Sequence, residues 1–232
     1  MQTSFAWDFA PAFPSVGLWK PISIELYDGA IIRSVTVHTK KTSTHWKLII
    51  VNYLETPKTY GEIKGVISAV LTVKNNNTIK EGKNFAVSTN EEGTLVKRLN
   101  LKIPIQDVDV WWPNGYGKQP LYELNVFVFT AGNKGENYQK TIQIGFRTVE
   151  LVEERTGVGA HNTTGGRGRT FFFKINGYPL FMKGANWVPA HILPEHSGDE
   201  RVVDLLLQSA HDAHMTMLRV WGGGLYESDY FY

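Results

Sequence analysis

Residues 95–103 read LVKRLNLKI, and residues 122–129 read YELNVFVF. In both stretches apolar side chains alternate with polar ones: Leu95, Leu99, Leu101 and Ile103 in the first, and Leu124, Val126 and Val128 in the second. A period of two is typical of a β-strand that buries one face of its sheet. These two stretches therefore predict that the middle of the chain is a β-sheet with one buried face.

Similar short apolar segments lie on both sides of these stretches. Short apolar runs bounded by Gly, Asn, Pro or charged residues occupy residues 35–38, 46–54, 66–73 and 142–149. Turn-forming residues at 75–78 and 90–93 separate some of them, and no segment of helical length intervenes. Six or seven strands in about 120 residues predict an immunoglobulin-like β-sandwich.

The pattern changes after residues 157–169 (GVGAHNTTGGRGR), which are too polar and glycine-rich to be ordered by burial and predict a connecting loop. Beyond this loop, the apolar runs 171–175 and 178–182 flank Asn176 and Gly177. An Asn-Gly pair supplies the two positive φ angles of a type I′ turn, so these runs predict a hairpin.

A helix and a further strand are expected next. Ser197 and Glu200 have the spacing of a capping box, and the apolar residues that follow recur at helical intervals: Val203, Leu206, Leu207 and Ala210. The apolar run 217–221 then ends at three glycines. A strand, a helix and a strand in this order form the unit from which parallel sheets and (β/α)₈ barrels are built. About a quarter of such a barrel would be present.

Composition excludes several function classes. No apolar run reaches the roughly 18 residues of a membrane-spanning helix, and the absence of cysteine excludes disulfides and thiol catalysis. The formal net charge is +2, with Lys and Arg scattered along the chain, which disfavours a nucleic-acid partner. His211 and His214 are three residues apart, but no third ligand lies nearby, so we predict no metal site.

Polar residues at predicted strand ends are the candidates for chemistry. Asp8 lies between Trp7 and Phe9, where a carboxylate can accept hydrogen bonds from two sugar hydroxyls while a ring covers the apolar sugar face. Taken alone, this stretch is explained somewhat better by a turn aspartate beside two core aromatics.

Two further candidates lie near the predicted barrel strands. Asn186 and Trp187 end one strand, and Arg219 lies inside the next, where a buried guanidinium would need a carboxylate partner. That partner would form either a structural ion pair or part of a site. Catalytic groups of barrels gather at the carboxyl ends of the strands, which favours a site here.

Five motifs occur in order along the chain: WDFAPAFPSVGLWKPISIELYD from residue 7, WWPNGYGKQPLYEL from 111, GFRTVELVEE from 145, FKINGYPLFMKGANWVP from 173 and LRVWGGGLYESDYFY from 218. Together they make the chain resemble the β-mannosidases of glycoside hydrolase family two. Residues 39–100 and 155–169 match only in general character.

The resemblance implies a multidomain, mainly β protein. Residues 1–28 would be the tail of a jelly-roll domain, residues 29–149 an immunoglobulin-like β-sandwich, and residues 150–232 the first βα units of a truncated (β/α)₈ TIM barrel.

The resemblance also implies a sugar subsite. Trp7 and Asp8 would reach into the terminal-sugar subsite, Asn186 and Trp187 would lie at the mouth of the first barrel strand, and Trp221 would line the sugar. Arg219 would orient the nucleophilic carboxylate, and Gly222 would support the same motif.

The implied activity is retaining removal of β-linked mannose from the non-reducing ends of glycoprotein oligosaccharides, in the lysosome, without metal or organic cofactor. A retaining glycosidase uses two carboxyl groups about 5 Å apart. In this family both come from later strands, beyond Tyr232, so the chain itself is expected to be inactive. The N-terminus has no leader pattern, so the protein is either cytosolic or a piece whose signal lies upstream.

Two alternatives remain open: a sister activity (β-galactosidase, β-glucuronidase or exo-glucosaminidase) and a non-catalytic carbohydrate-binding module. Asn76 and Asn162 lie in glycosylation sequons, which fit a secretory-pathway protein.

Overall fold

The computed structural model describes residues 11, 16–58, 61–88, 93–131, 137–155 and 168–232. Trp7, Asp8, Asn162 and nearly all of the predicted loop 157–169 therefore lie outside the described residues.

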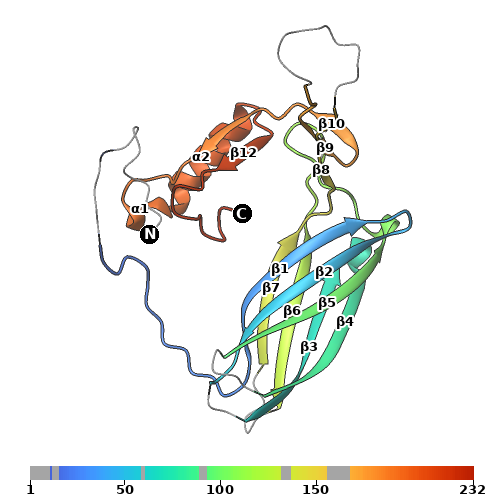
Figure 1. Ribbon diagram of the computed structural model, residues 1–232, viewed down its shortest axis with the longest axis vertical. Helices are drawn as coiled ribbons and strands as arrows, with labels where there is room; N and C mark the ends of the chain where they lie inside the picture. Colours follow the sequence, from blue (N-terminus) through green and yellow to red (C-terminus); the bar gives the residue numbers. More distant parts are fainter. Residues whose placement is uncertain (1–10, 12–15, 59–60, 89–92, 132–136, 156–167) are drawn as a thin grey trace.

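A β-sandwich forms the larger part of the molecule (Figure 1). One sheet has the order β1-β2-β5 and the other β4-β3-β6-β7, with every neighbouring pair antiparallel. The chain crosses between the sheets after β2, β4 and β5. The strands are β1 (Ile31–Lys41), β2 (His45–Glu55), β3 (Glu62–Thr72), β4 (Thr78–Ser88), β5 (Thr94–Pro104), β6 (Tyr122–Ala131) and β7 (Asn137–Ile144).

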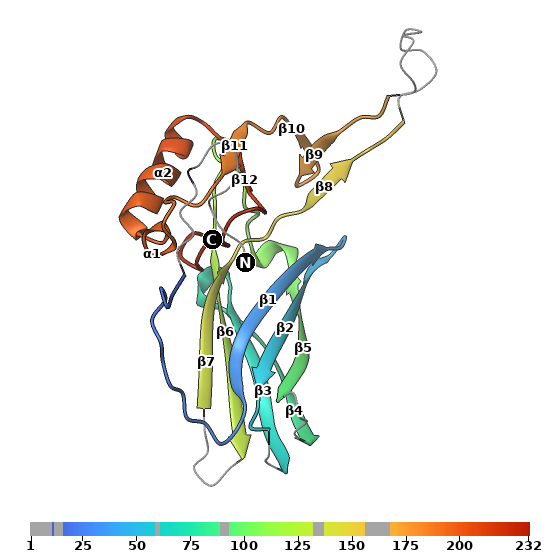
Figure 2. The same ribbon diagram turned by 60° about the vertical axis from the view of Figure 1, so that its left-hand side comes forward.

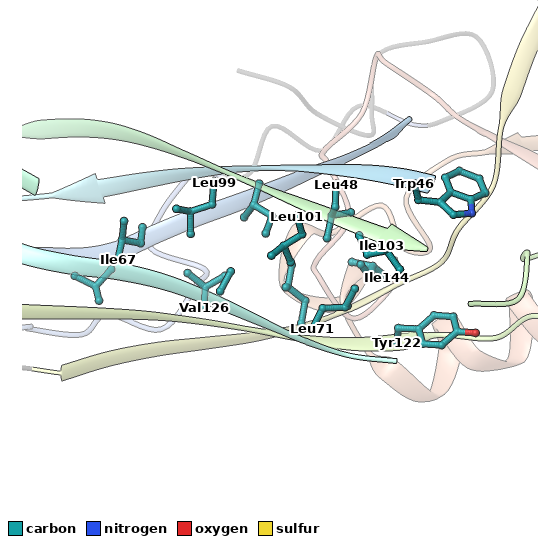
Figure 3. Packing of buried hydrophobic residues seen from close by; sticks show 14 of the residues in the cluster. Trp46, Leu48, Ile67, Leu71, Leu99, Leu101, Ile103, Tyr122, Val126 and Ile144 are labelled. Carbon is teal, nitrogen blue, oxygen red and sulfur yellow. The ribbon is translucent and has the colours of Figure 1, made fainter. Parts of the chain in front are cut away.

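The core lies between the two sheets and confirms the alternation seen in the sequence. Leu99, Leu101 and Ile103 of β5 and Leu124, Val126 and Val128 of β6 are all buried there, and Figure 3 shows part of this packing. At one end of the core Phe146 lies between two rings, 5.4 Å from Trp46 and 5.6 Å from Tyr122 between ring centroids. Burial of apolar area stabilises this sandwich by about 25 cal/mol per Å².

Two details of the strand prediction were wrong. β4 was not expected, because Phe85 is its one fully buried residue and an edge strand of this kind leaves almost no apolar alternation. Residues 142–149 were expected to form one strand, but β7 ends at Ile144 and Val149 begins β8 (Val149–Val152), which belongs to another sheet.

Tight turns connect the strands at the ends of the sandwich. Asn75 and Asn76 both have φ of 58° in the short turn η1 (Lys74–Asn76) that joins β3 to β4. Asparagine is among the few residues that adopt this left-handed conformation at low cost. The side chain of Asn76 is exposed at this turn, so a glycan there would meet no core residue. A second short turn, η2 (Ile105–Asp107), follows β5.

A smaller sheet follows the sandwich, with the order β10-β9-β8. β9 (Phe172–Ile175) and β10 (Tyr178–Leu180) form the predicted hairpin, and Asn176 and Gly177 at its turn have φ of 53° and 86°. The type I′ prediction is therefore confirmed in the signs of both angles.

The last part of the chain is a parallel strand pair with helices beside it (Figure 2). β11 (Gly184–Trp187) pairs with β12 (Met217–Val220), and α1 (Pro194–Ser197) and α2 (Glu200–Asp212) lie between them in sequence. The predicted strand, helix, strand order is confirmed. No TIM barrel is evident in the described part of the chain, so the jelly-roll tail and the barrel start remain predictions. None of the described helices is long and apolar enough to cross a bilayer.

The predicted capping box was wrong. Ser197 ends α1, where its hydroxyl donates to the carbonyl of Pro194 at 2.8 Å, and Asp199 is the N-cap of α2. The Asp199 side chain accepts from the backbone N–H of Arg201 at 3.0 Å. A proline at the first position of α1 places Ser197 inside a helical turn, and this removes it from the cap position.

The predicted apolar face of α2 is only partly buried. Val203 is 3% exposed, but Leu206 is 40% exposed. The sheet of β11 and β12 that lies beside α2 (Figure 2) has only two strands, so it offers the helix a small surface to pack against.

Candidate functional site

The parallel register brings four predicted residues to the carboxyl ends of β11 and β12. Asn186 lies opposite Arg219, and Trp187 lies opposite Val220. Trp221 extends this pairing by one residue, since its backbone N–H donates to the carbonyl of Trp187 at 2.8 Å. We call Asn186, Trp187, Arg219 and Trp221 the strand-end cluster.

Arg219 is placed differently from its sequence-based expectation. Its side chain is exposed, and its Nη1 donates to Oδ1 of Asn186 at 3.0 Å. The guanidinium is therefore not buried as expected; among the described residues no carboxylate lies within ion-pair distance of it, so its acidic partner stays a prediction. The apolar neighbours of Arg219 in the sequence point to the opposite face of the sheet, because side chains alternate along a strand.

The side chain of Trp187 is fixed by contacts with residues that follow β12. The side chain is 6% exposed, and its indole N–H donates to Oε1 of Glu227 at 2.8 Å. The ring of Phe231 packs against it, with 4.7 Å between ring centroids. Trp187 is thus a support of the cluster more than an open surface. The sequence showed Glu227 only as an acid near a strand end, and no spacing rule linked it to Trp187.

The same segment is tied to helix α2. The hydroxyl of Tyr230 lies 2.9 Å from both carboxylate oxygens of Asp204, and this hydrogen bond raises the pKa of Tyr230. Residues 227–231 therefore join the end of β11 to the helix through the side chains of Glu227, Tyr230 and Phe231.

The glycines after Trp221 differ in their surroundings. A Cβ at Gly223 would clash with the Trp221 ring, and a Cβ at Gly224 would lie 2.8 Å from Pro189. Gly222, the predicted supporting residue, has open space around it. Close backbone approach therefore requires glycine at the second and third positions, which matches the expectation of a tight turn against bulky groups.

Trp7 and Asp8 lie outside the described residues, so their convergence with Trp221 stays a prediction. No group of three potential metal ligands occurs within the part of the chain that the structure describes. His211 contacts Asp212 at 3.1 Å, and His214 adopts a φ of 56° at the end of α2.

A separate hollow of about 420 Å³ lies at the other end of the parallel strands. Its lining side chains are all apolar, so sugar hydroxyls would find few hydrogen-bond partners there. This hollow is therefore a poor candidate for a sugar site. Its lining residues are Phe171, Phe172, Phe173, Pro179, Leu180, Phe181, Met182 and Met217.

Two asparagines fix the sandwich against the C-terminal unit. Asn114, in the WWPNGYG motif, donates to the carbonyls of His211 and Met215 at 2.9 and 3.3 Å, at the end of α2. Asn176 donates to the carbonyl of Trp111 at 3.0 Å and accepts from the N–H of Thr148 at 3.0 Å. The motif thus contacts both the helix and the hairpin.

Stacking contacts reinforce this junction. The rings of Trp112 and Tyr178 are 5.7 Å apart, and the guanidinium of Arg147 lies 4.6 Å from the Trp111 ring centroid. Burial lowers the pKa of Arg147. The junction gives the strand-end cluster a defined position relative to the sandwich.

Comparison with known proteins places this geometry in a family. The model described as "Glycosyl hydrolases family 2" matches residues 30–147, about half of the chain, which span all seven sandwich strands. The chain belongs to glycosyl hydrolases family 2. The family 2 chain is 37% identical over 237 residues to the beta-mannosidase of Rattus norvegicus and 35% identical over 234 residues to a probable beta-mannosidase of Caenorhabditis elegans.

A solved structure agrees along almost the entire chain. The beta-D-mannosidase of Dictyoglomus thermophilum superposes with a TM-score of 0.75 and 31% identity, covering 99% of this family 2 chain and 26% of its own. The two curated relatives are matched over all of the family 2 chain but over 25% and 24% of their own lengths. The family 2 chain therefore spans about a quarter of the proteins it matches.

Proposed function

We propose that the family 2 chain is the portion of a retaining exo-β-mannosidase that carries the sandwich and one wall of the sugar subsite. Its substrate would be terminal β-mannose on glycoprotein oligosaccharides, and its compartment the lysosome. The observation that supports this best is the hydrogen-bonded Asn186 and Arg219 pair at the carboxyl ends of two parallel strands. Beta-mannosidases that match the chain from end to end add support.

Each residue has a chemical role in this proposal. One N–H group of Arg219 donates to Asn186, and the other four of its five N–H groups can donate to a carboxylate and orient it. Trp221 would cover the apolar face of the sugar, and Trp7 and Asp8 would bind its hydroxyls. Trp187 would not contact the sugar; as a buried side chain, it would support the other residues of the cluster.

The reaction itself needs groups that these residues do not supply. Retaining hydrolysis requires a nucleophilic carboxylate and an acid/base carboxyl about 5 Å apart. In the proposal both come from strands that follow residue 232, and Glu227 has neither role; its Oε1 accepts from the indole N–H of Trp187. The 232-residue chain should then bind sugar weakly without cleaving it.

The first test is an assay of the pure 232-residue chain on p-nitrophenyl β-mannoside. We expect no release of p-nitrophenol above the rate without protein. Hydrolysis at an enzymatic rate would contradict the assignment of the catalytic acids to other segments.

The second test uses the product of the longest reading frame that contains these residues. Its activity is compared on the β-mannoside, β-galactoside, β-glucuronide and β-glucosaminide. We expect the β-mannoside to be preferred. Preference for another glycoside would favour a sister activity, and sugar binding without hydrolysis by that product would favour a binding module.

A further inference from the structure

A row of three lysines crosses the sheet β1-β2-β5, which Figure 1 shows with its strands side by side. Lys40 of β1 lies directly opposite Lys47 of β2, and Lys47 lies directly opposite Lys102 of β5. We call Lys40, Lys47 and Lys102 the basic row. It lies close to the hairpin that joins β1 to β2.

The basic row is on the outer face of the sandwich. Trp46 and Leu48, the neighbours of Lys47 along β2, are buried in the core, so Lys47 points the other way. Residues directly opposite in a sheet share a face, and Lys40 and Lys102 are exposed. The three side chains therefore project together from one surface.

Within the described part of the chain, no acid is paired with the charges of these three lysines. Between the basic row and Tyr53, the outward positions of the three strands carry no acid but do carry Arg98. Glu55, farther along β2, is already hydrogen-bonded to Tyr27 at 2.7 Å and paired with Arg33.

Like charges placed directly opposite destabilise a sheet. The basic row holds two such pairs, and an anion bound across it would remove the repulsion. Neighbouring strands are about 4.8 Å apart, so the three lysines span about 10 Å at the backbone, more than one tetrahedral oxyanion covers. A ligand that matches the row must therefore carry repeated anionic groups.

We propose that the basic row is a binding site for a sulfated polysaccharide. Lysine ammonium groups are point charges suited to sulfate oxygens, and a linear sulfated chain presents anions at repeated short intervals. Proteins that bind single-stranded nucleic acids stack the bases on aromatic side chains. The row next to the basic row consists of His38, Ile49 and Asn100, so it contains no Phe, Tyr or Trp on which bases could stack. This site is separate from the strand-end cluster and independent of the function proposed for it.

The test measures binding of a heparin hexasaccharide to the 232-residue chain by calorimetry at several salt concentrations. The variant Lys40→Gln/Lys47→Gln/Lys102→Gln should weaken binding at least about tenfold and lower the slope of log K against log salt by about 3, one per lost contact. Lys80→Gln is the matched control, because it removes one exposed charge from β4 of the opposite sheet and should change affinity less than about twofold.

The melting temperature gives a second readout without ligand. The triple variant should melt at the same temperature as the unchanged chain or higher, because the opposed charges are gone. The hexasaccharide should raise the melting temperature of the unchanged chain and not that of the triple variant.

Three outcomes would overturn the proposal. One is equal hexasaccharide affinity of the triple variant and the unchanged chain. Another is that inorganic sulfate alone gives the full stabilisation, which would indicate a single-anion site. The third is lysine-dependent binding of single-stranded DNA of equal charge that is as tight as hexasaccharide binding, which would assign the row to nucleic acid.

Discussion

At the scale of the residue, one hydrogen bond holds the buried tryptophan of the strand-end cluster. The indole N–H of Trp187 has its acceptor in Glu227, and Phe231 covers the ring. A buried N–H without an acceptor costs about 1–3 kcal/mol. Glu227 therefore determines whether the end of β11 keeps its conformation.

Replacing Glu227 by leucine should leave this indole N–H unpaired. We expect Glu227→Leu to lower the free energy of unfolding by about 1–3 kcal/mol, measured by urea denaturation. The Trp187 indole resonance in a ¹H–¹⁵N spectrum should shift upfield. Glu227→Gln keeps an acceptor oxygen and should shift the resonance less, and an unchanged resonance in the leucine variant would refute this role.

Residue types near the cluster could be predicted from the sequence, but their surroundings could not. Asn186, Trp187, Arg219 and Trp221 were singled out as polar or aromatic residues at strand ends, and the parallel register does bring them together. The exposure of Arg219 depends on which face of a four-residue strand it occupies, and a short strand has too few residues to show an alternation.

At the scale of the element, a close backbone approach controls the pairing of β11 and β12. A Cβ at Gly184 would collide with the carbonyl oxygen of Met217, the residue opposite it. Backbone atoms cannot move aside as a flexible side chain can. Only glycine at the start of β11 therefore permits this register.

A methyl group at Gly184 should separate the two strands. We expect Gly184→Ala to raise amide hydrogen exchange in β11 and β12 by about tenfold or more, because each lost hydrogen bond is worth about 1 kcal/mol. Exchange in β1 to β7 should not change. The control is Gly198→Ala, where a Cβ meets no atom within 4 Å; equal effects of the two variants would contradict the argument.

Elements with a regular apolar pattern were predictable, and elements shaped by local contacts were not. β5 and β6 alternate because both pack against the core, and the Asn176-Gly177 turn has a chemical signature of its own. β4 buries too little to be recognised. The N-cap of α2 shifted to Asp199 because Pro194 begins a separate helical turn before it.

At the scale of the whole molecule, Asn114 connects the sandwich to the end of helix α2. Its amide donates to two carbonyls of residues about 100 positions away in sequence. Removing it should loosen the C-terminal unit and leave the sandwich core intact.

Asn114→Ala should therefore raise hydrogen exchange at the end of α2 by about thirtyfold, since two hydrogen bonds of about 1 kcal/mol each are lost. Mass spectrometry of peptides covering residues 205–216 would measure this. Gln119→Ala is the control, because Gln119 bonds to the Trp112 carbonyl within the same loop. The same exchange rate in both variants would show that Asn114 does not couple the two parts.

The arrangement of distant segments was the least predictable property. Lysines 40, 47 and 102 are scattered in the sequence, and their clustering exists only in the register of β1, β2 and β5. Charges scattered in the sequence disfavoured a nucleic-acid partner, but such scatter does not show which charges a sheet aligns on one face.

The hairpin residue Asn176 combines requirements that few amino acids meet. Its backbone has a positive φ, and its amide both accepts from Thr148 and donates to Trp111. Glycine would keep the angle but lose both bonds, and aspartate would keep the acceptor but lose the donor. A substitution at this single position should therefore disturb three segments of the protein at once: the hairpin turn, the residue that precedes β8 and the loop at Trp111.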